Sequence, residues 1–190
     1  MFLETKGRIL LQKAANYFTK GIENHPDLNS AIEHKLNYQL IQVRAQLFQN
    51  NQSVEFYKQR LSERPDDPQV YCYLIQCYSL ADQIQEMKNV LDAGLNQFPD
   101  HGLLNYLAGT VFAREGNIEM ALNSWEKAIQ LDPEWLDSRL ARASLLERDQ
   151  RLQEAAQEWR LVIEWLKNRE FFTDRPNAEL QRIEKKINNN

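Results

Sequence analysis

Residues 108–133 read AGTVFAREGNIEMALNSWEKAIQLDP, and this stretch decides the fold. Apolar residues recur three and four positions apart on both sides of the segment EGN (115–117). This spacing is typical of amphipathic helices and predicts two of them, at 103–114 and 118–131, joined by a tight turn. Pro133 cannot continue a helix interior, so it ends the second helix.

Very small residues stand among bulky ones in this stretch. Gly109, Ala121 and Ala128 are the small ones, and Phe112 and Trp125 are bulky. Two antiparallel helices approach closely only where one presents a small residue to the bulk of the other. We therefore expect Gly109 and Ala121 to lie between the paired helices, Phe112 and Trp125 to fill the remaining space, and Ala128 to admit the next unit.

The pattern repeats with a period of 34 residues. Pro65, Pro99 and Pro133 are each 34 positions apart, and such a period indicates stacked helical repeats. Lys167 stands where the next proline would fall, so the last second helix is expected to run on through Trp165. A shift of 34 aligns Tyr78 with Phe112, Leu91 with Trp125, Gly94 with Ala128, Ala143 with Gly109, Ala155 with Ala121, and Trp159 with Trp125.

This pattern resembles the tetratricopeptide-repeat (TPR) family, most closely over residues 68–167 and less closely over 30–67. The resemblance implies an all-α fold, a right-handed α-solenoid of helix-turn-helix repeats with a C-terminal capping helix. Asn105 and Arg139 depart from the family, which usually has a bulky residue where Tyr71 keeps one. Met87 likewise replaces a small residue. The predicted repeats are 30–67 (divergent), 68–101, 102–135 and 136–170.

The N-terminal segment, residues 1–29, is predicted to be a helix resembling half a repeat. Ala14, Phe18, Gly21 and Pro26 have the spacing of Ala121, Trp125, Ala128 and Pro133. Either the chain starts with a lone packing helix, or a longer protein has lost its first part. Residues Ser30 and Glu33 read as a capping box at the start of the following helix, expected over 31–49 and followed by a partner over 53–63.

Residues 171–190 are predicted to form a C-terminal helix beginning near Pro176, followed by a short tail. Leu180, Ile183 and Ile187 make one apolar stripe among charged residues. Two interpretations stay open: the polar-faced cap that helical arrays need for solubility, or a helix that docks on another chain.

The composition is that of a soluble globular protein, with 43% hydrophobic residues and a net charge of −4. The chain has no long basic run, so nucleic acid and anionic membranes are not favoured partners. No apolar run reaches the ~18 residues of a membrane span. Cys72 and Cys77 would lie about 140° apart on one helix, which argues against a disulfide between them. A cytoplasmic location fits; a periplasmic domain of a truncated or processed protein is the alternative.

No arrangement of residues predicts catalysis, a cofactor site or a metal site. The chain contains neither a glycine-rich phosphate loop nor a nucleophile elbow. His25, His34 and His101 fall near predicted loops or a helix start, share no metal-ligand spacing, and are expected on the surface. Trp135, between two repeats, is the one tryptophan with a candidate binding role. The acidic residues expected to cap helix starts are Asp67, Asp100 and Glu134.

The resemblance also implies a concave groove, lined by the first helices of the repeats, that holds an extended peptide or a helix of a partner. Chaperone-binding members grip a terminal carboxylate with lysines and asparagines there, and the matching places here are neutral or apolar, which disfavours that function. Arg114, Asp137 and Arg148 are expected toward the rim, with Leu103 beside the groove. The predicted groove residues are Tyr38, Gln42, Cys72, Gln76, Leu103, Tyr106, Thr110, Arg114, Asp137, Leu140, Ser144 and Arg148.

The favoured function is a non-catalytic scaffold, adaptor or assembly factor that binds a partner protein or peptide. The alternative is a regulatory or substrate-recruiting TPR domain of a larger enzyme or cell-envelope machine. An enzyme or small-ligand binder in its own right is the least favoured hypothesis. A homo-oligomer through the terminal helices also stays open.

Overall fold

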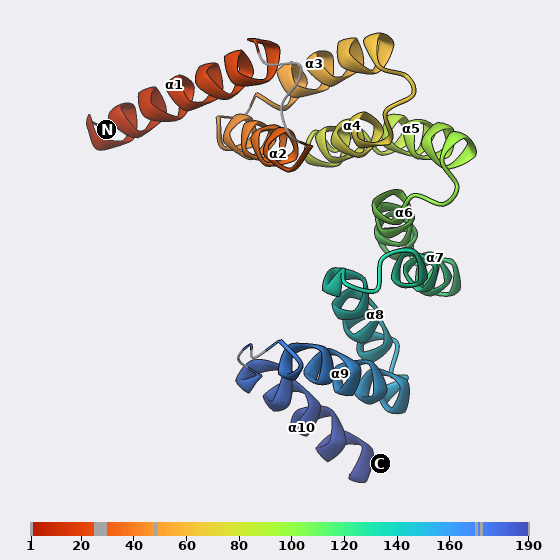
Figure 1. Ribbon diagram of the computed structural model, residues 1–190. Coiled ribbons are helices and arrows are strands. Elements are labelled where there is room, and N and C mark those ends of the chain that lie inside the picture. The colour runs from red at the N-terminus through yellow and green to blue at the C-terminus, as the bar shows by residue number, and fades with distance from the viewer. Residues whose placement is uncertain (1, 25–29, 48, 170, 172, 190) are drawn as a thin grey trace. The chain divides into compact units, whose positions relative to one another are not determined.

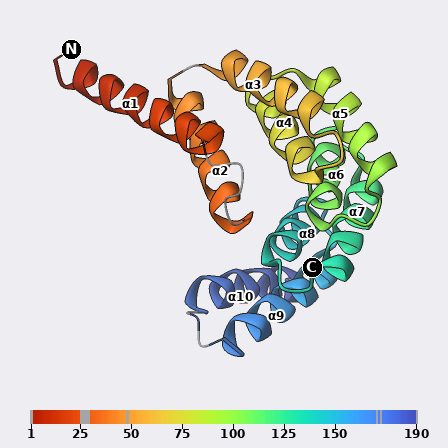
Figure 2. The same ribbon diagram turned by 45° about the horizontal axis from the view of Figure 1, so that its top comes forward.

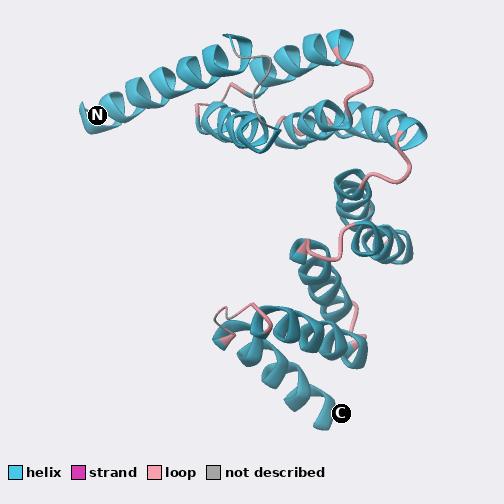
Figure 3. Cartoon of the chain, in the orientation of Figure 1, coloured by secondary structure: helices cyan, strands magenta, loops and turns pink. Residues whose placement is uncertain are grey.

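A computed structural model describes residues 2–24, 30–47, 49–169, 171 and 173–189, and all regular structure among them is helical (Figure 3). The side chains of residues 2–6 and 30–35 lie outside this description. The chain forms two compact units, Met1–Phe98 and Pro99–Asn190. Each unit is described by itself below.

The first unit contains five helices, α1 (Phe2–Asn24), α2 (Ser30–Gln46), α3 (Asn50–Glu63), α4 (Pro68–Leu80) and α5 (Ile84–Gln97) (Figure 1). Helix α1 packs against α2, while α4 packs against α2, α3 and α5. Because neighbours cover it on several sides, α4 is buried along most of its length, from Val70 to Ile75 and at Cys77 and Tyr78. This helix forms the centre of the unit.

The second unit also contains five helices, α6 (Gly102–Arg114), α7 (Ile118–Leu131), α8 (Leu136–Arg148), α9 (Leu152–Lys167) and α10 (Asp174–Asn188) (Figure 2). Helix α6 pairs with α7, α8 pairs with α9, and α10 packs against α9. The hairpin expected over 103–114 and 118–131 is therefore present as α6 and α7. Helix α9 runs on to Lys167, as the missing proline predicts.

The close approach of α6 and α7 depends on Gly109. A Cβ atom at Gly109 would lie 2.5 Å from both Cδ1 and Nε1 of Trp125, so the indole occupies the space that a side chain would need. The same indole Nε1 donates a hydrogen bond to the carbonyl of Tyr106, 3.0 Å away. Ala121 and Trp125 are both buried. The alternation of small and bulky residues is thus a packing pattern between the two helices.

Tyr71 and Asn105, which occupy the same place in successive predicted repeats, share a role. The Tyr71 hydroxyl donates to the carbonyl of Pro65, 3.1 Å away, and Asn105 Nδ2 donates to the carbonyl of Pro99, 2.9 Å away. Positions 34 residues apart therefore satisfy the carbonyl of the proline that ends the preceding repeat. A smaller amide does this in place of an aromatic ring, which explains why the helical hairpin tolerates Asn105.

The helix starts differ from the expected pattern of acidic caps. Asp67 does cap α4, because its carboxylate accepts from the backbone N–H of Gln69 at 2.9 Å. At α6, however, the cap is His101, whose Nδ1 accepts from the N–H of Leu104, while Asp100 instead forms an ion pair with Lys127. Trp135 occupies the capping position of α8 without a side-chain hydrogen bond, so the prediction for Glu134 is also wrong. The predicted Ser30–Glu33 capping box and two of the histidines, His25 and His34, fall outside the described side chains.

Helix α10 covers the end of the second unit with its apolar stripe. Ile183 is buried, and Leu180 and Ile187 pack partly against the same core cluster as Leu145 and Leu146 of α8. The stripe is used within the chain, which agrees with the interpretation of α10 as a capping helix.

Three helix ends close with the same left-handed residue. Asp82, Gly116 and Gln150 have φ angles of 58°, 77° and 62°, and they are 34 positions apart. The residue after each donates a backbone hydrogen bond to a carbonyl five positions earlier, as Arg151 does to Leu146 at 2.9 Å. This is the helix-ending motif in which glycine is favoured, because other residues are strained at positive φ.

We expect Gln150→Gly to raise the free energy of unfolding by about 1 kcal/mol, because glycine adopts this φ without steric cost. Gly116→Ala should lower it by about the same amount at the equivalent position. Urea unfolding followed by circular dichroism measures both. Destabilisation by Gln150→Gly would show that its side chain contributes more than its backbone strain costs.

Candidate partner-binding surface

Five of the predicted groove residues converge on one cavity of the second unit. This cavity, called here the α6–α8 groove, has a volume of about 310 Å³. Tyr106, Thr110 and Arg114 come from α6, and Ser144 and Arg148 come from α8. These residues are brought together because α6 and α8 are first helices of successive predicted repeats and lie next to each other. The remaining lining residues are Ala113, Trp125, Ala141 and Leu145.

A second cavity of about 480 Å³, called here the α8–α10 groove, lies on the other side of α8. The predicted residues Leu140 and Ser144 line it, so Ser144 borders both cavities. Ser144 is exposed, and its hydroxyl donates to the carbonyl of Leu140 in its own helix. The side chains that the sequence analysis missed come largely from α9 and α10. They are Leu136, Glu147, Trp159, Val162, Leu166, Arg175, Pro176, Glu179 and Arg182.

Charged side chains hold α10 against α8 at the rim of this groove. Arg182 Nη2 donates to Glu147 Oε2 at 2.6 Å, and Lys186 Nζ lies 3.0 Å from Glu147 Oε1. Arg182 also pairs with Glu179 on its own helix at 2.6 Å. The hydrogen bond from Arg182, joined by Lys186, lowers the pKa of Glu147 from 4.5 to about 2 despite partial burial of the carboxylate.

This lowered pKa predicts an acid-sensitive attachment of α10. Glu147 contributes its full stabilisation above its unfolded-state pKa near 4.5, and the contribution is lost as the pH falls from there toward the folded-state value of about 2. We expect the unfolding midpoint to fall over this interval in the wild type and less steeply in Glu147→Gln. Thermal unfolding at a series of pH values measures the difference. Equal slopes for the two proteins would contradict the assignment.

An aromatic pair borders the α6–α8 groove near the start of α8. The rings of Tyr106 and Trp135 are stacked with centroids 5.7 Å apart, and Trp135 Nε1 donates to Asp137 Oδ2 at 2.8 Å. Burial and the neighbouring Asp137 carboxylate raise the pKa of Tyr106. Trp135 and the exposed Asp137 therefore act on the groove through Tyr106, the only one of the three that lines it within the described part of the chain.

The predicted residues of the first unit do not join this site. Tyr38 is 44% exposed, and Gln42 and Gln76 are half-buried. Cys72 has no exposed surface, because it belongs to the enclosed helix α4, and its prediction as a groove residue is wrong. Leu103 of the second unit is also buried and cannot contact a partner as predicted.

The two cysteines are free, and burial raises the pKa of both thiols. Cys77 lies in the same enclosed helix as Cys72. Across the described residues, no group of three histidine, cysteine or acidic side chains is placed to hold a metal ion. None of the helices, over the residues described, is both long and apolar enough to span a bilayer.

The fold can now be compared with solved structures. A TPR protein of Thermus thermophilus, TTC0263, superposes with a TM-score of 0.70, at 20% identity, over 95% of this chain and 93% of that one. MamA (residues 41 to the end) from Desulfovibrio magneticus RS-1 superposes with a TM-score of 0.60, at 20% identity, over 83% and 86% of the two chains. This chain has the TPR fold.

A further TPR-fold structure is YrrB, described as a TPR protein with an unusual peptide-binding site. It superposes with a TM-score of 0.53, at 20% identity, over 80% of this chain and 75% of its own. No protein-family model and no curated protein sequence matches the chain. The comparisons therefore confirm the all-helical repeat fold that the 34-residue period predicts.

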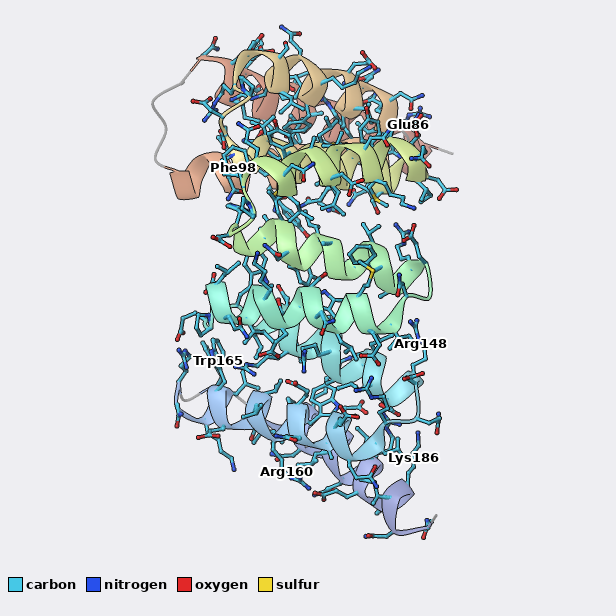
Figure 4. The ribbon with its side chains drawn as sticks, turned by 90° about the vertical axis from the view of Figure 1, so that its right-hand side faces the viewer. Glu86, Phe98, Arg148, Arg160, Trp165 and Lys186 are labelled. Atoms are coloured by element: carbon cyan, nitrogen blue, oxygen red, sulfur yellow. The ribbon has the colours of Figure 1, made fainter. Side chains whose placement is uncertain are left out.

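The two ends of the second unit's helices differ in chemistry. Figure 4 shows Arg148 and Lys186 at one end of these helices and Trp165 at the other. Trp165 stacks with the exposed Phe171, and the Arg169 guanidinium lies 4.1 Å from the Trp165 ring centroid. Aromatic side chains thus gather at one end of the unit, and Arg148 marks the opposite end.

Proposed function

We propose that the chain is a non-catalytic scaffold that binds a partner protein through the α6–α8 groove and the adjoining α8–α10 groove. The observation that carries the proposal is the convergence of Tyr106, Thr110, Arg114, Ser144 and Arg148 on one cavity. These residues were selected from the repeat register alone, and the TPR fold brings them together. A groove with an aromatic anchor and hydroxyl groups suits an extended peptide or a helix.

The lining of the α6–α8 groove favours a particular peptide chemistry. Its two charged residues are Arg114 and Arg148, and its lining contains no carboxylate among the described residues. Tyr106, Trp125 and Leu145 supply apolar surface. We infer that the bound segment carries an apolar side chain near Tyr106 and an acidic group toward Arg148, since charge complementarity guides association and register.

A substitution at Ser144 tests the proposal directly. Ser144→Trp places a large ring where the two grooves meet, while the exposed Ser144 contributes little to the core. We expect this variant to keep its helical circular dichroism and to lose at least tenfold in partner affinity, about 1.4 kcal/mol or more. Affinity capture from native lysate identifies the partner, and titration of the purified pair measures the loss.

Gln157→Trp is the matched control, because Gln157 is exposed on α9 and lines neither groove. It should leave partner affinity unchanged. A partner that binds both variants as it binds the wild type would move the interaction away from these grooves and overturn the proposal. We prefer Ser144 to Tyr106 for this test, because Tyr106 also supports Trp135 through the aromatic stack.

A further inference from the structure

Helix α1 has two apolar faces, of which the neighbouring helix α2 covers one. Ala15 and Ile22 are buried in the cluster that α1 forms with α2, and Leu11 and Phe18 pack against it. On the outward face, Ile9, Leu10 and Tyr17 are 51%, 67% and 74% exposed. Large apolar side chains gathered on one exposed helix face mark an interaction site more often than scattered ones do.

The repeat register indicates what kind of element would cover the outward face. Phe18 corresponds to Trp125 of α7, and Trp125 lies against Gly109 of the preceding helix α6. Helix α1 packs against α2, and no other described helix packs substantially against it. Within the described residues, α1 therefore resembles a second helix of a repeat that packs against no first helix of its own.

The outward residues form a seam suited to another helix. Gly7, Leu10, Ala14, Tyr17 and Gly21 follow spacings of three and four, so they lie along one line of α1. Large residues alternate with small ones along this seam, and a Cβ atom at Gly7 would meet nothing within 4 Å. A lipid surface requires no such gaps, whereas a helix inserts its own side chains into them.

The charges beside the seam define its partner. Lys13 and Lys20 are exposed and seven residues apart, and they flank the seam on the side away from Leu11 and Phe18. An antiparallel second copy that set Leu10 opposite Ala14 would bring Lys13 near its own counterpart, which is repulsive. We propose that the seam of α1 docks an amphipathic helix of another protein that carries aspartate or glutamate along the flank facing Lys13 and Lys20. This surface is separate from the α6–α8 groove and does not depend on it.

Two synthetic peptides, each about three heptads long, test the proposal. They share one apolar heptad stripe and differ only in having glutamate or lysine along one flank. Fluorescence anisotropy with the full chain should show that the glutamate peptide binds about tenfold more tightly than the lysine peptide. Lys13→Glu with Lys20→Glu should reverse this preference. Leu10→Ser with Tyr17→Ser should weaken binding of both peptides at least tenfold and leave the unfolding midpoint of the protein unchanged.

Lys167→Glu with Lys185→Glu is the matched control, because it changes the net charge equally at exposed positions of the second unit. It should keep the wild-type preference. Equal affinity for the two peptides, or no binding of the glutamate peptide, would overturn the proposal. Dimerisation of the chain in sedimentation experiments, lost on Leu10→Ser with Tyr17→Ser, would assign the seam to a second copy instead. Binding to phosphatidylglycerol vesicles that depends on the same residues would assign it to a lipid surface.

Discussion

Trp125→Ala is expected to lower the free energy of unfolding by about 3–5 kcal/mol, the cost of removing a large aromatic from a core. The ring is buried, fills the space left by Gly109, and donates to the carbonyl of Tyr106. Its removal leaves a cavity between α6 and α7 and one carbonyl without that donor. Urea unfolding followed by circular dichroism measures the loss, and a change below about 1 kcal/mol would mean that the indole is not core.

The link between Trp125 and Gly109 can be isolated by a double-mutant cycle. Gly109→Ala alone should destabilise by about 1–2 kcal/mol, because overpacking against the indole outweighs the better helix propensity of alanine. In a Trp125→Ala background the same change should be neutral or stabilising, since the indole no longer occupies the space. Additive effects in the cycle would contradict direct packing between these two residues.

Arg142→Met is expected to cost about 3 kcal/mol, because it leaves the buried carboxylate of Glu158 without its main partner. Arg142 Nε donates to Glu158 Oε1 at 2.8 Å, and the two side chains are 18% and 10% exposed. Arg142 Nη1 also donates to the carbonyl of Leu122 at 2.9 Å and lies 3.1 Å from Glu126. One guanidinium therefore ties α8 to both α7 and α9.

The double variant Arg142→Met with Glu158→Leu provides the control. It removes both charges together, so its stability should return to within about 1 kcal/mol of the wild type. Chemical unfolding of the two single variants and the double variant measures this. A double variant as unstable as Arg142→Met would show that the bond to Leu122, rather than the buried ion pair, carries the effect.

The helical hairpins could be predicted from the sequence because their causes are local. Prolines every 34 residues end the second helices, and the small residue at Gly109 faces the bulk of Trp125. Helix α7 accordingly begins and ends at the predicted residues, Ile118 and Leu131. The assignment of residues to repeats within the chain stays a prediction.

The surroundings of each helix could not be predicted, because they depend on how closely neighbouring helices approach. Cys72 shares its repeat position with Tyr106, yet α4 is enclosed by α2, α3 and α5, whereas Tyr106 borders a groove. The segment PQVYCYLIQCYSL (68–80) is apolar all round, and this was the available signal of a buried helix. Likewise, Arg142 occupies the place of Ala108, and the repeat pattern contains no sign of its partner Glu158.

The most direct test of the scaffold proposal is physical contact at the grooves. A photo-reactive phenylalanine analogue at position 144, with position 157 as control, can be expressed in native cells, irradiated and analysed for covalent adducts. The account predicts a discrete protein adduct from position 144 and none from position 157. Adducts from position 157 alone, or equal adducts from both positions, would contradict a partner bound in the α6–α8 and α8–α10 grooves.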